Sequence, residues 1–253
     1  MSDGRTGGEP GADTIGGAHL SLRDQVYREV RERIIDGRLP SGRRIVEREL
    51  AEELGVSRVP VREALQRLES EGFVAVSARR GAFVAPFGPA EAADLFDIRE
   101  RLEALAAALA AVRADAAGLR VLEGLLARAR QAAGNARRTR ELASVHADFH
   151  RQIVVLAGNP LLLNLMAPLD GRLRRLFGLT TEPADGTAMC GEHELLYAAI
   201  RDGDAAGAER IAREHVAGTR AAAMRLLGPA EPAHPTAGAA PSGPSGPDHP
   251  PEP

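Results

Sequence analysis

Four of the seven histidines lie at spacings that suit a shared metal ion: His146, His150, His193 and His215. His146 and His150 are four residues apart on a predicted helix, so both imidazoles lie on one face and can meet the same ion. His193 and His215 fall on two consecutive predicted helices that are joined by a tight Asp-Gly-Asp turn, and antiparallel neighbours can place them opposite each other. Because imidazole is a good ligand for divalent transition metals, these four side chains are candidate ligands for such an ion, and an all-imidazole set favours zinc or nickel.

Two nearby residues, Cys190 and Asp148, also carry side chains of types that bind metals. Cys190 lies one turn before His193 and could be a soft metal ligand. The favoured interpretation is that it is a small, partly buried residue that binds no metal. Asp148 is two residues from His146 and therefore lies on another side of the helix. It is not expected to join the four imidazoles.

Arginines between residues 47 and 84 form a second group of candidate functional residues. The sequence predicts a helix that ends at Gly55, where a left-handed backbone costs little, and a second helix capped by Ser57 with Pro60 in its first turn. Burial of the apolar residues that face each other across this turn leaves Arg58 and Arg62 on the outer face of the second helix. Such an arrangement is typical of a helix-turn-helix.

A basic hairpin is predicted directly after these helices. Two short strands, 73–76 and 82–85, flank Arg79-Arg80-Gly81 and can place two arginines and a tight turn beside a DNA backbone. A helix over 22–36, with Ser21 and Asp24 as a capping box, precedes the motif. Together these elements predict a winged helix-turn-helix domain over residues 20–85.

The composition restricts the class of protein. The chain has 253 residues, of which 44% are hydrophobic, but no run of apolar residues predicts a transmembrane helix. Residues 1–19 lack the apolar core of a signal peptide, and the single Cys190 excludes an internal disulfide and suits a reducing cytoplasm. Residues 20–85 carry 13 Arg against 11 acidic residues, whereas the whole chain has a net charge of −3. This balance favours site-specific DNA binding over a general coat for nucleic acid.

The rest of the chain divides into a linker, a helical domain and two tails. Residues 86–89 form the linker, and residues 1–19 and 228–253 are predicted to be disordered. Residues 90–227 show helical periodicity throughout and predict an all-α antiparallel bundle of about six helices, near 90–112, 115–134, 138–157, 160–178, 187–202 and 204–226. The expected fold class is therefore mainly α.

From Leu20 to Leu227 the chain resembles transcription regulators of the GntR family, in the FadR subfamily with a C-terminal FCD domain. In the first domain the resemblance rests on GRLPSG at 37–42, VERELA at 46–51 and GVSRVPVREAL at 55–65. In the second it rests on DIRERLE at 97–103, FHR at 149–151, GNP at 158–160, EHE at 192–194, DGD at 202–204 and REH at 213–215. The resemblance covers the chain except for its two tails.

The resemblance implies roles for particular residues. Arginines at the positions of Arg48, Arg58 and Arg62 contact operator DNA in this family, and the tip of the wing lies in the minor groove. The implied DNA-binding set is Arg48, Ser57, Arg58, Val59, Arg62, Arg79, Arg80 and Gly81. Arg67 is expected instead to pair with Glu63 or Glu71 on its own helix.

In the second domain the resemblance implies a metal and an effector. Many FCD domains bind a divalent ion through one Asp and three His, and His146 stands at the position of that Asp, which leaves the choice of metal open. Arg99 lies by the ligand cavity in this family and is expected to hold a carboxylate effector. The alternative is an ion pair between Arg99 and Glu103.

The function that the resemblance implies is a bacterial transcription regulator, expected to be a repressor. It would bind a palindromic operator as a homodimer and would respond to a small organic acid. The two copies are expected to contact each other in or beside the linker and the first helices of the second domain. It is expected in the cytoplasm, at the nucleoid, with no membrane partner. A direct metal sensor and a metal-dependent enzyme are the alternatives, the enzyme being disfavoured because no His-Glu-x-x-His arrangement accompanies the histidines.

Overall fold

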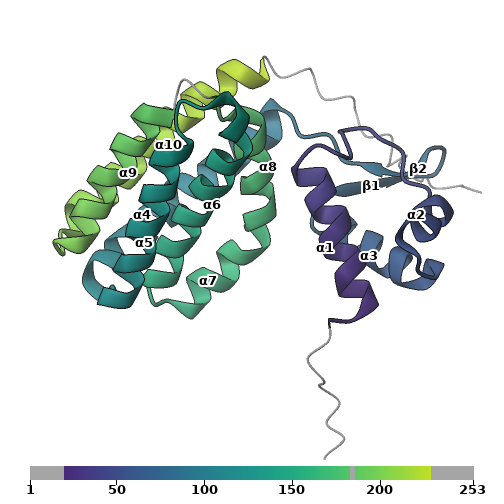
Figure 1. Ribbon diagram of the computed structural model, residues 1–253, viewed down its shortest axis with the longest axis horizontal. Coiled ribbons are helices and arrows are strands. Elements are labelled where there is room, and N and C mark those ends of the chain that lie inside the picture. Colours follow the sequence, from purple (N-terminus) through teal and green to yellow (C-terminus); the bar gives the residue numbers. More distant parts are fainter. Residues whose placement is uncertain (1–19, 183–185, 229–253) are drawn as a thin grey trace, which may run out of the picture.

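The computed structural model describes residues 20–182 and 186–228, which form two domains (Figure 1). The predicted tails, 1–19 and 228–253, lie outside the described residues apart from Gly228. The fold class agrees with the prediction: a winged helix-turn-helix precedes an all-helical domain. No helix in the described part of the chain is long and apolar enough to cross a membrane.

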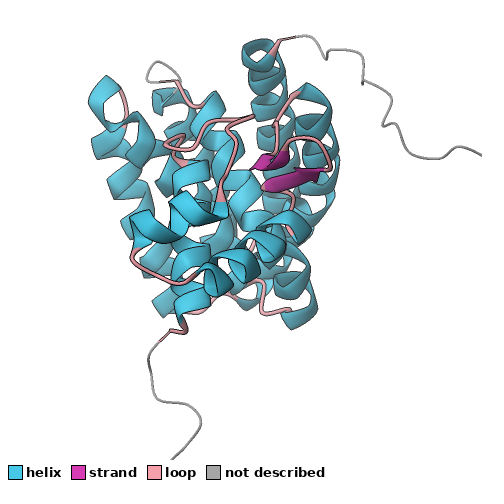
Figure 2. Ribbon diagram, turned by 90° about the vertical axis from the view of Figure 1, so that its right-hand side faces the viewer, coloured by secondary structure: helices cyan, strands magenta, loops and turns pink. Residues whose placement is uncertain are grey.

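The first domain packs three helices against a two-stranded wing, which Figure 2 shows in magenta. Its elements are α1 (Leu22–Ile35), α2 (Glu47–Leu54), α3 (Arg58–Ser70), β1 (Val74–Ser77) and β2 (Gly81–Val84). The strands are antiparallel, with Val74 opposite Val84, and each is displaced by one residue from its predicted limits. Their apolar faces complete one core with the three helices, in which Val30, Val61 and Leu68 are fully buried.

Local signals in the sequence explain most of these limits. The Ser21 hydroxyl accepts a hydrogen bond from the Asp24 backbone N–H at 3.2 Å and so begins α1 as predicted. Gly55 ends α2 with a φ of 65°, as its position predicts. Ser57 does stand at the N-cap position of α3, but its side chain makes no capping hydrogen bond, so that part of the prediction is wrong.

The second domain is a bundle of helices that run up and down beside one another (Figure 1). Its helices are α4 (Pro89–Arg113), α5 (Ala116–Ala132), α6 (Thr139–Leu156), α7 (Pro160–Met166), α8 (Asp170–Thr180), α9 (Gly186–Arg201) and α10 (Ala205–Leu227). Two short 3-10 helices, η1 (Ala136–Arg138) and η2 (Ala167–Leu169), connect some of them.

One predicted helix is wrong in extent. The single helix expected over 160–178 is two helices, α7 and α8, separated by η2. Pro168 lies within η2, and a proline there has no N–H for a continuous α-helical hydrogen-bond ladder. The break allows α8 to take its own direction, towards the first domain.

The two domains touch along α8, which lies on the side of the bundle nearest α1 (Figure 1). Gly171 makes this approach possible, because a Cβ there would lie only 2.6 Å from the Phe73 ring and would also strike Arg31. Arg172 Nε then donates a hydrogen bond to the Glu71 carbonyl at 3.0 Å, and Arg31 pairs with Asp170 at 3.4 Å. The helical domain is therefore in direct contact with the DNA-binding domain.

Candidate functional site

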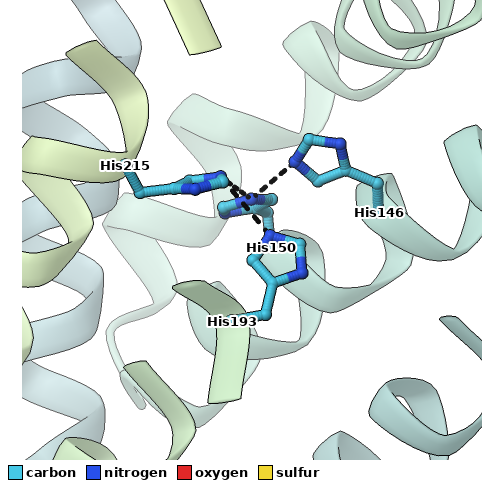
Figure 3. Close-up of side chains that lie close together, drawn as sticks. All are labelled: His146, His150, His193 and His215. Carbon is cyan, nitrogen blue, oxygen red and sulfur yellow. Dashed lines mark hydrogen bonds between the residues drawn. The ribbon is translucent and has the colours of Figure 1, made fainter. Parts of the chain in front are cut away.

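The four histidines singled out in the sequence meet at one point inside the bundle (Figure 3). α6 supplies His146 and His150, α9 supplies His193, and α10 supplies His215. The short α9–α10 connection brings the last two together: Gly203 has a φ of 77°, and the Asp204 carboxylate caps α10 by accepting from the Gly207 N–H at 2.9 Å. All four side chains are buried.

The ring nitrogens face one another at distances that fit a common ion. The Nε2 atoms are 3.1 Å apart for His146 and His150, 3.2 Å for His150 and His215, and 3.4 Å for His193 and His215. One nitrogen from each of the four rings lies within 4.8 Å of all the others. Zinc–nitrogen bonds of about 2.0–2.1 Å in a tetrahedral site separate the nitrogens by about 3.4 Å, close to the shortest spacings here.

Two carboxylates lie behind this cluster, and sequence reasoning did not assign them to it. Glu103 Oε2 lies 3.0 Å from His150 Nδ1, and Glu192 Oε2 lies 2.6 Å from His215 Nδ1. Each carboxylate accepts the Nδ1–H, which fixes the tautomer and leaves the Nε2 lone pair directed at the centre. A carboxylate behind a ligating imidazole is the usual outer shell of a metal site.

These tautomers show that the residues fit a cation. With Nδ1–H committed to carboxylates, the neutral forms of His150 and His215 each have a lone pair on Nε2, so their 3.2 Å contact then brings two lone pairs together. Such a contact is repulsive unless a positive charge lies between the two atoms. The donor set thus favours a metal ion over a network of hydrogen bonds among the rings.

The electrostatic environment favours the neutral form of three of the imidazoles, those of His146, His150 and His193, which is the form that binds metals. Burial and the neighbouring imidazoles hold the pKa of His146 and that of His193 well below the ordinary value. Burial also lowers the pKa of His150, against the opposing effect of Glu103. The Nδ1 of His146 is buried and has no hydrogen-bond partner among the described residues.

The two further candidate ligands lie apart from the cluster. Cys190 is buried, and its desolvation raises the pKa of its thiol. It is not among the four residues whose ligand atoms converge. Asp148 pairs with Arg174 at 2.6 Å on another side of α6, as its spacing predicts.

Arg99 is completely buried and forms an ion pair with Glu103, which was the alternative to an effector-binding role. Its Nε donates to Glu103 Oε1 at 2.7 Å, so Arg99, Glu103 and His150 form one chain of contacts. Burial tends to raise the pKa of Glu103, but Arg99 and His150 outweigh it and leave that pKa below its ordinary value. The guanidinium also lies 4.7 Å from the Phe177 ring centre, and its Nη1 is buried and has no hydrogen-bond partner in the described part of the chain.

A small cavity opens beside the imidazoles. It has a volume of about 200 Å³ and is lined on one side by His146 and His215, with Thr180 and Thr219 contributing hydroxyl groups. Phe177 also lines it and stacks on His146 with ring centres 4.0 Å apart. Arg99 does not reach the cavity wall, because Phe177 lies between it and His146.

The predicted DNA-binding residues lie on the exposed side of the first domain. Arg58 and Arg62 project from α3 with more than half of each side chain exposed, and both pair with Glu47, at 3.4 and 3.0 Å. Ser57 and Val59 are exposed beside them, and Arg48 on α2 is exposed and lies 3.9 Å from Glu52. Arg79, Arg80 and Gly81 are exposed at the wing tip, where Gly81 has a φ of 71°.

Arg67 behaves as its spacing predicts and is held within the domain. It pairs with Glu71 at 3.1 Å, one of its two predicted partners, and its guanidinium lies 3.7 Å from the Tyr27 ring centre. Arg67 is therefore held by contacts with both its own helix and α1.

Both halves of the chain match known families. Residues 22–84 match the model of bacterial regulatory proteins of the gntR family, and residues 94–218 match the model of the FCD domain. The chain is 30% identical over 198 residues to a probable D-xylose utilization operon transcriptional repressor of Paenarthrobacter nicotinovorans, which covers 78% of this chain and 84% of that protein. It is 29% identical over 199 residues to the transcriptional regulator McbR of Escherichia coli, covering 78% and 90%.

The solved structure of E. coli McbR/YncC has the same arrangement. It superposes with a TM-score of 0.70 at 27% sequence identity, covering 81% of this chain and 98% of that one. The named relatives are transcriptional regulators, which confirms the prediction of a regulator rather than an enzyme. The chain therefore belongs to the GntR family of bacterial regulatory proteins and is a DNA-binding transcription regulator with an FCD domain.

Proposed function

We propose that this protein is a dimeric repressor of the bacterial cytoplasm whose FCD domain holds a divalent transition metal and releases operator DNA when a small organic acid binds. The observation that carries the proposal is the cluster of four buried imidazoles whose Nε2 atoms converge, with Glu103 and Glu192 behind two of them. A bound ion would offer a Lewis-acidic centre at the wall of the 200 Å³ cavity. A metabolite with a carboxylate and a neighbouring hydroxyl or keto oxygen has the size and charge for that place.

Operator binding is assigned to the exposed arginines of the first domain. Arg58 and Arg62 suit base readout in the major groove, because a guanidinium can donate two hydrogen bonds to one guanine. Arg79, Arg80 and Gly81 at the wing tip suit backbone or minor-groove contacts, as do Arg48, Ser57 and Val59 beside the recognition helix. Glu47 would have to give up its two arginines on binding, which favours DNA with good complementarity over any polyanion.

A homodimer is the assembly that a palindromic operator requires, and α4 offers a surface for it. Ile98, Leu105 and Val112 are exposed on α4 at seven-residue intervals, so they form one apolar stripe along the outside of the bundle. A second copy of the chain would bury this stripe. The stripe lies on the helix that directly follows the linker, which ends at Gly88 because α4 begins at Pro89, one residue earlier than the predicted linker limit. A dimer formed there would set the distance between the two DNA-binding domains.

α8 is the element that would transmit the signal. Phe177 on α8 stacks on His146 and lines the cavity, while Arg172, more than one turn earlier, is bonded to the Glu71 carbonyl of the first domain. An acid that displaces the Phe177 ring would therefore bias the position of the helix that touches the DNA-binding domain.

A direct metal sensor is the second candidate. The four imidazoles come from α6, α9 and α10, so occupancy of the site itself would alter how these helices pack. Operator binding measured with chelator alone, with metal alone, and with metal plus acid separates the two functions. Release by acid only in the presence of metal supports the proposed function, whereas a change between chelator and metal alone supports the sensor.

The metal site is tested by metal content. Purified protein should carry close to one equivalent of zinc or nickel, and His150→Ala and His193→Ala should each reduce that content and the thermal stability. Cys190→Ala is the matched control, since Cys190 is buried in the same bundle but outside the cluster. His146→Asp should retain metal, because a carboxylate can replace the imidazole there. Unchanged metal content in the His150/His193 double variant would reject the site.

The effector is tested by a screen of small hydroxy-, keto- and sugar acids. Stabilisation should appear with metal-loaded protein and be small after removal of the metal. Arg99 does not line the cavity, but an acid that displaces the Phe177 ring would gain access to its Nη1, a buried donor that has no hydrogen-bond partner among the described residues. Arg99→Ala should therefore reduce the response, and an equal response in this variant and in metal-free protein would place the effector elsewhere.

A further inference from the structure

A second cavity lies where the two domains meet, away from the imidazole cluster. Its volume is about 420 Å³. One wall is the end of α1 with the loop over residues 36–41, and the other is formed by α6 and α8. Three arginines line the second wall: Arg140, Arg174 and Arg175.

Arg175 is unusual because it is a buried cation without an acidic partner. Only 4% of it is exposed, and its Nη2 donates to the Ser41 hydroxyl at 2.9 Å and to the Ala85 carbonyl at 2.7 Å. Both acceptors are neutral, and within the described residues no carboxylate lies at ion-pair distance from the guanidinium. Burial lowers the pKa of Arg175, opposed only by the more distant Glu91. An uncompensated buried charge is costly, and an anion beside it removes that cost.

The other charged groups of the cavity do not supply this anion. Glu32 and Asp36 lie on the opposite wall, but each is paired with an arginine of the first domain, Arg31 at 3.4 Å and Arg38 at 2.7 Å. Arg174 is satisfied by Asp148 and Asp170 on its own side. Arg140 is exposed at the cavity, and no ion pair involves it among the described residues. Two arginines with unused donors thus face one space.

We propose that this interdomain cavity is an anion site, in which Arg175 and Arg140 hold a small dianionic oxyanion: free inorganic phosphate or the phosphoryl group of a small metabolite. The Nε and Nη1 groups of Arg175 make no hydrogen bond among the described residues and remain as separate donors, and a phosphate has several acceptor oxygens for two arginines. The volume of about 420 Å³ leaves room for an organic group beyond the phosphate.

Occupancy of this site would act on the contact between the domains. Arg175 already binds Ser41 in the loop before the helix-turn-helix and Ala85 after the wing. An anion between Arg175 and this loop would strengthen the attachment of the DNA-binding domain to α8. It would therefore restrict the orientations of that domain independently of the metal centre.

Titration calorimetry of full-length protein with inorganic phosphate tests the proposal. Wild type should bind one phosphate per chain. Arg140→Gln removes one cationic partner, and Ser144→Glu introduces a negative charge at an exposed position of the cavity wall, so each should weaken binding at least about tenfold. Arg137→Gln is the matched control, because Arg137 is exposed three residues earlier and does not line the cavity. It should bind phosphate as wild type does.

Two further arms locate the site and its ligand. Protein treated with a chelator should bind one phosphate per chain as untreated protein does, since the imidazole cluster and this cavity share no residue. A phosphomonoester such as glycerol phosphate that binds more tightly than phosphate identifies an organic ligand, and equal affinity identifies phosphate itself. No binding at about 10 mM phosphate, which excludes a dissociation constant of about 10 mM or tighter, would overturn the proposal. Wild-type affinity in Arg140→Gln and Ser144→Glu, or loss of binding after treatment with a chelator, would overturn it as well.

Discussion

Replacing Glu103 with glutamine should separate the two tasks that this carboxylate performs in the bundle. Its Oε1 accepts the Arg99 Nε–H at 2.7 Å, and its Oε2 lies 3.0 Å from His150 Nδ1. Arg99 is fully buried and Glu103 is 4% exposed, so water cannot replace the lost charge. A glutamine has nearly the same shape but leaves the Arg99 cation unneutralised.

The two effects have different magnitudes. Removing one partner of a buried ion pair costs about 3–5 kcal/mol, and the aromatic rings of Phe96 and Phe177, 5.1 and 4.7 Å from the guanidinium, place the expected loss near the lower end. Loss of the carboxylate behind a ligating imidazole lowers metal affinity about 10–100-fold. We therefore expect metal-free Glu103→Gln to lose about 3 kcal/mol of unfolding free energy, and metal binding to weaken by one to two orders of magnitude.

Denaturant unfolding of the metal-free protein measures the first effect, and competition with a chromophoric chelator measures the second. Glu192→Gln is the control, because Glu192 lies behind His215 in the same way but is half exposed and has no buried arginine to neutralise. It should weaken metal binding while changing the stability of the metal-free protein by less than about 1 kcal/mol. The reasoning fails if Glu103→Gln unfolds and binds metal as wild type does, or if Glu192→Gln destabilises the metal-free protein equally.

Three further predictions concern the first domain and the assembly. Arg58→Ala and Arg62→Ala should each lose about 1–3 kcal/mol of operator-binding free energy and relax base preference, whereas Arg79→Ala should weaken binding to all DNA sequences more evenly. Gel-shift titrations on operator and scrambled DNA measure this. A uniform loss in all three variants would contradict the assignment. Leu105→Glu on the exposed stripe of α4 should convert dimers to monomers in light scattering, and an unchanged mass would move the interface elsewhere. Burial and a hydrogen bond to Glu71 raise the pKa of Tyr27 to about 12, so the protonated phenol stabilises the fold fully below pH about 10 and this contribution is lost as the pH rises through about 12. Tyr27→Phe should lower the unfolding free energy by about 1 kcal/mol at pH 7 and lessen its decline above pH 10, and equal pH profiles would contradict this.

Much of the DNA-binding half could be predicted from the sequence because its signals are local. Ser21, Gly55 and the apolar spacing of α2 and α3 act within a few residues, so they determine helix limits and leave Arg58 and Arg62 on the outer face. The same applies to His146 and His150, whose spacing of four residues already places both rings on one face of α6.

The helical domain was less predictable wherever its structure depends on distant contacts. Pro168 lies within a periodic apolar segment, and that periodicity concealed the break that the proline makes between α7 and α8; the packing of α8 against α1 could not be read from the sequence. The sequence offered one hint for Glu192, which is next to His193 in the Glu-His-Glu motif, and one for Glu103, which is four residues from Arg99. Neither hint says which imidazole the carboxylate supports.

By itself, the sequence determined which functional side chains are present and which elements carry them: four imidazoles on helices, and arginines on one helix face and one hairpin. The tertiary structure alone decided that the four imidazoles converge, that Glu103 and Glu192 direct two of them, and that Arg99 and Arg175 are buried rather than solvated. The physical reason is that helical periodicity fixes the face on which a side chain lies. Its partner and its degree of burial are set by which other helix packs there, and that helix can be more than 60 residues away in the chain, as His215 is from His150.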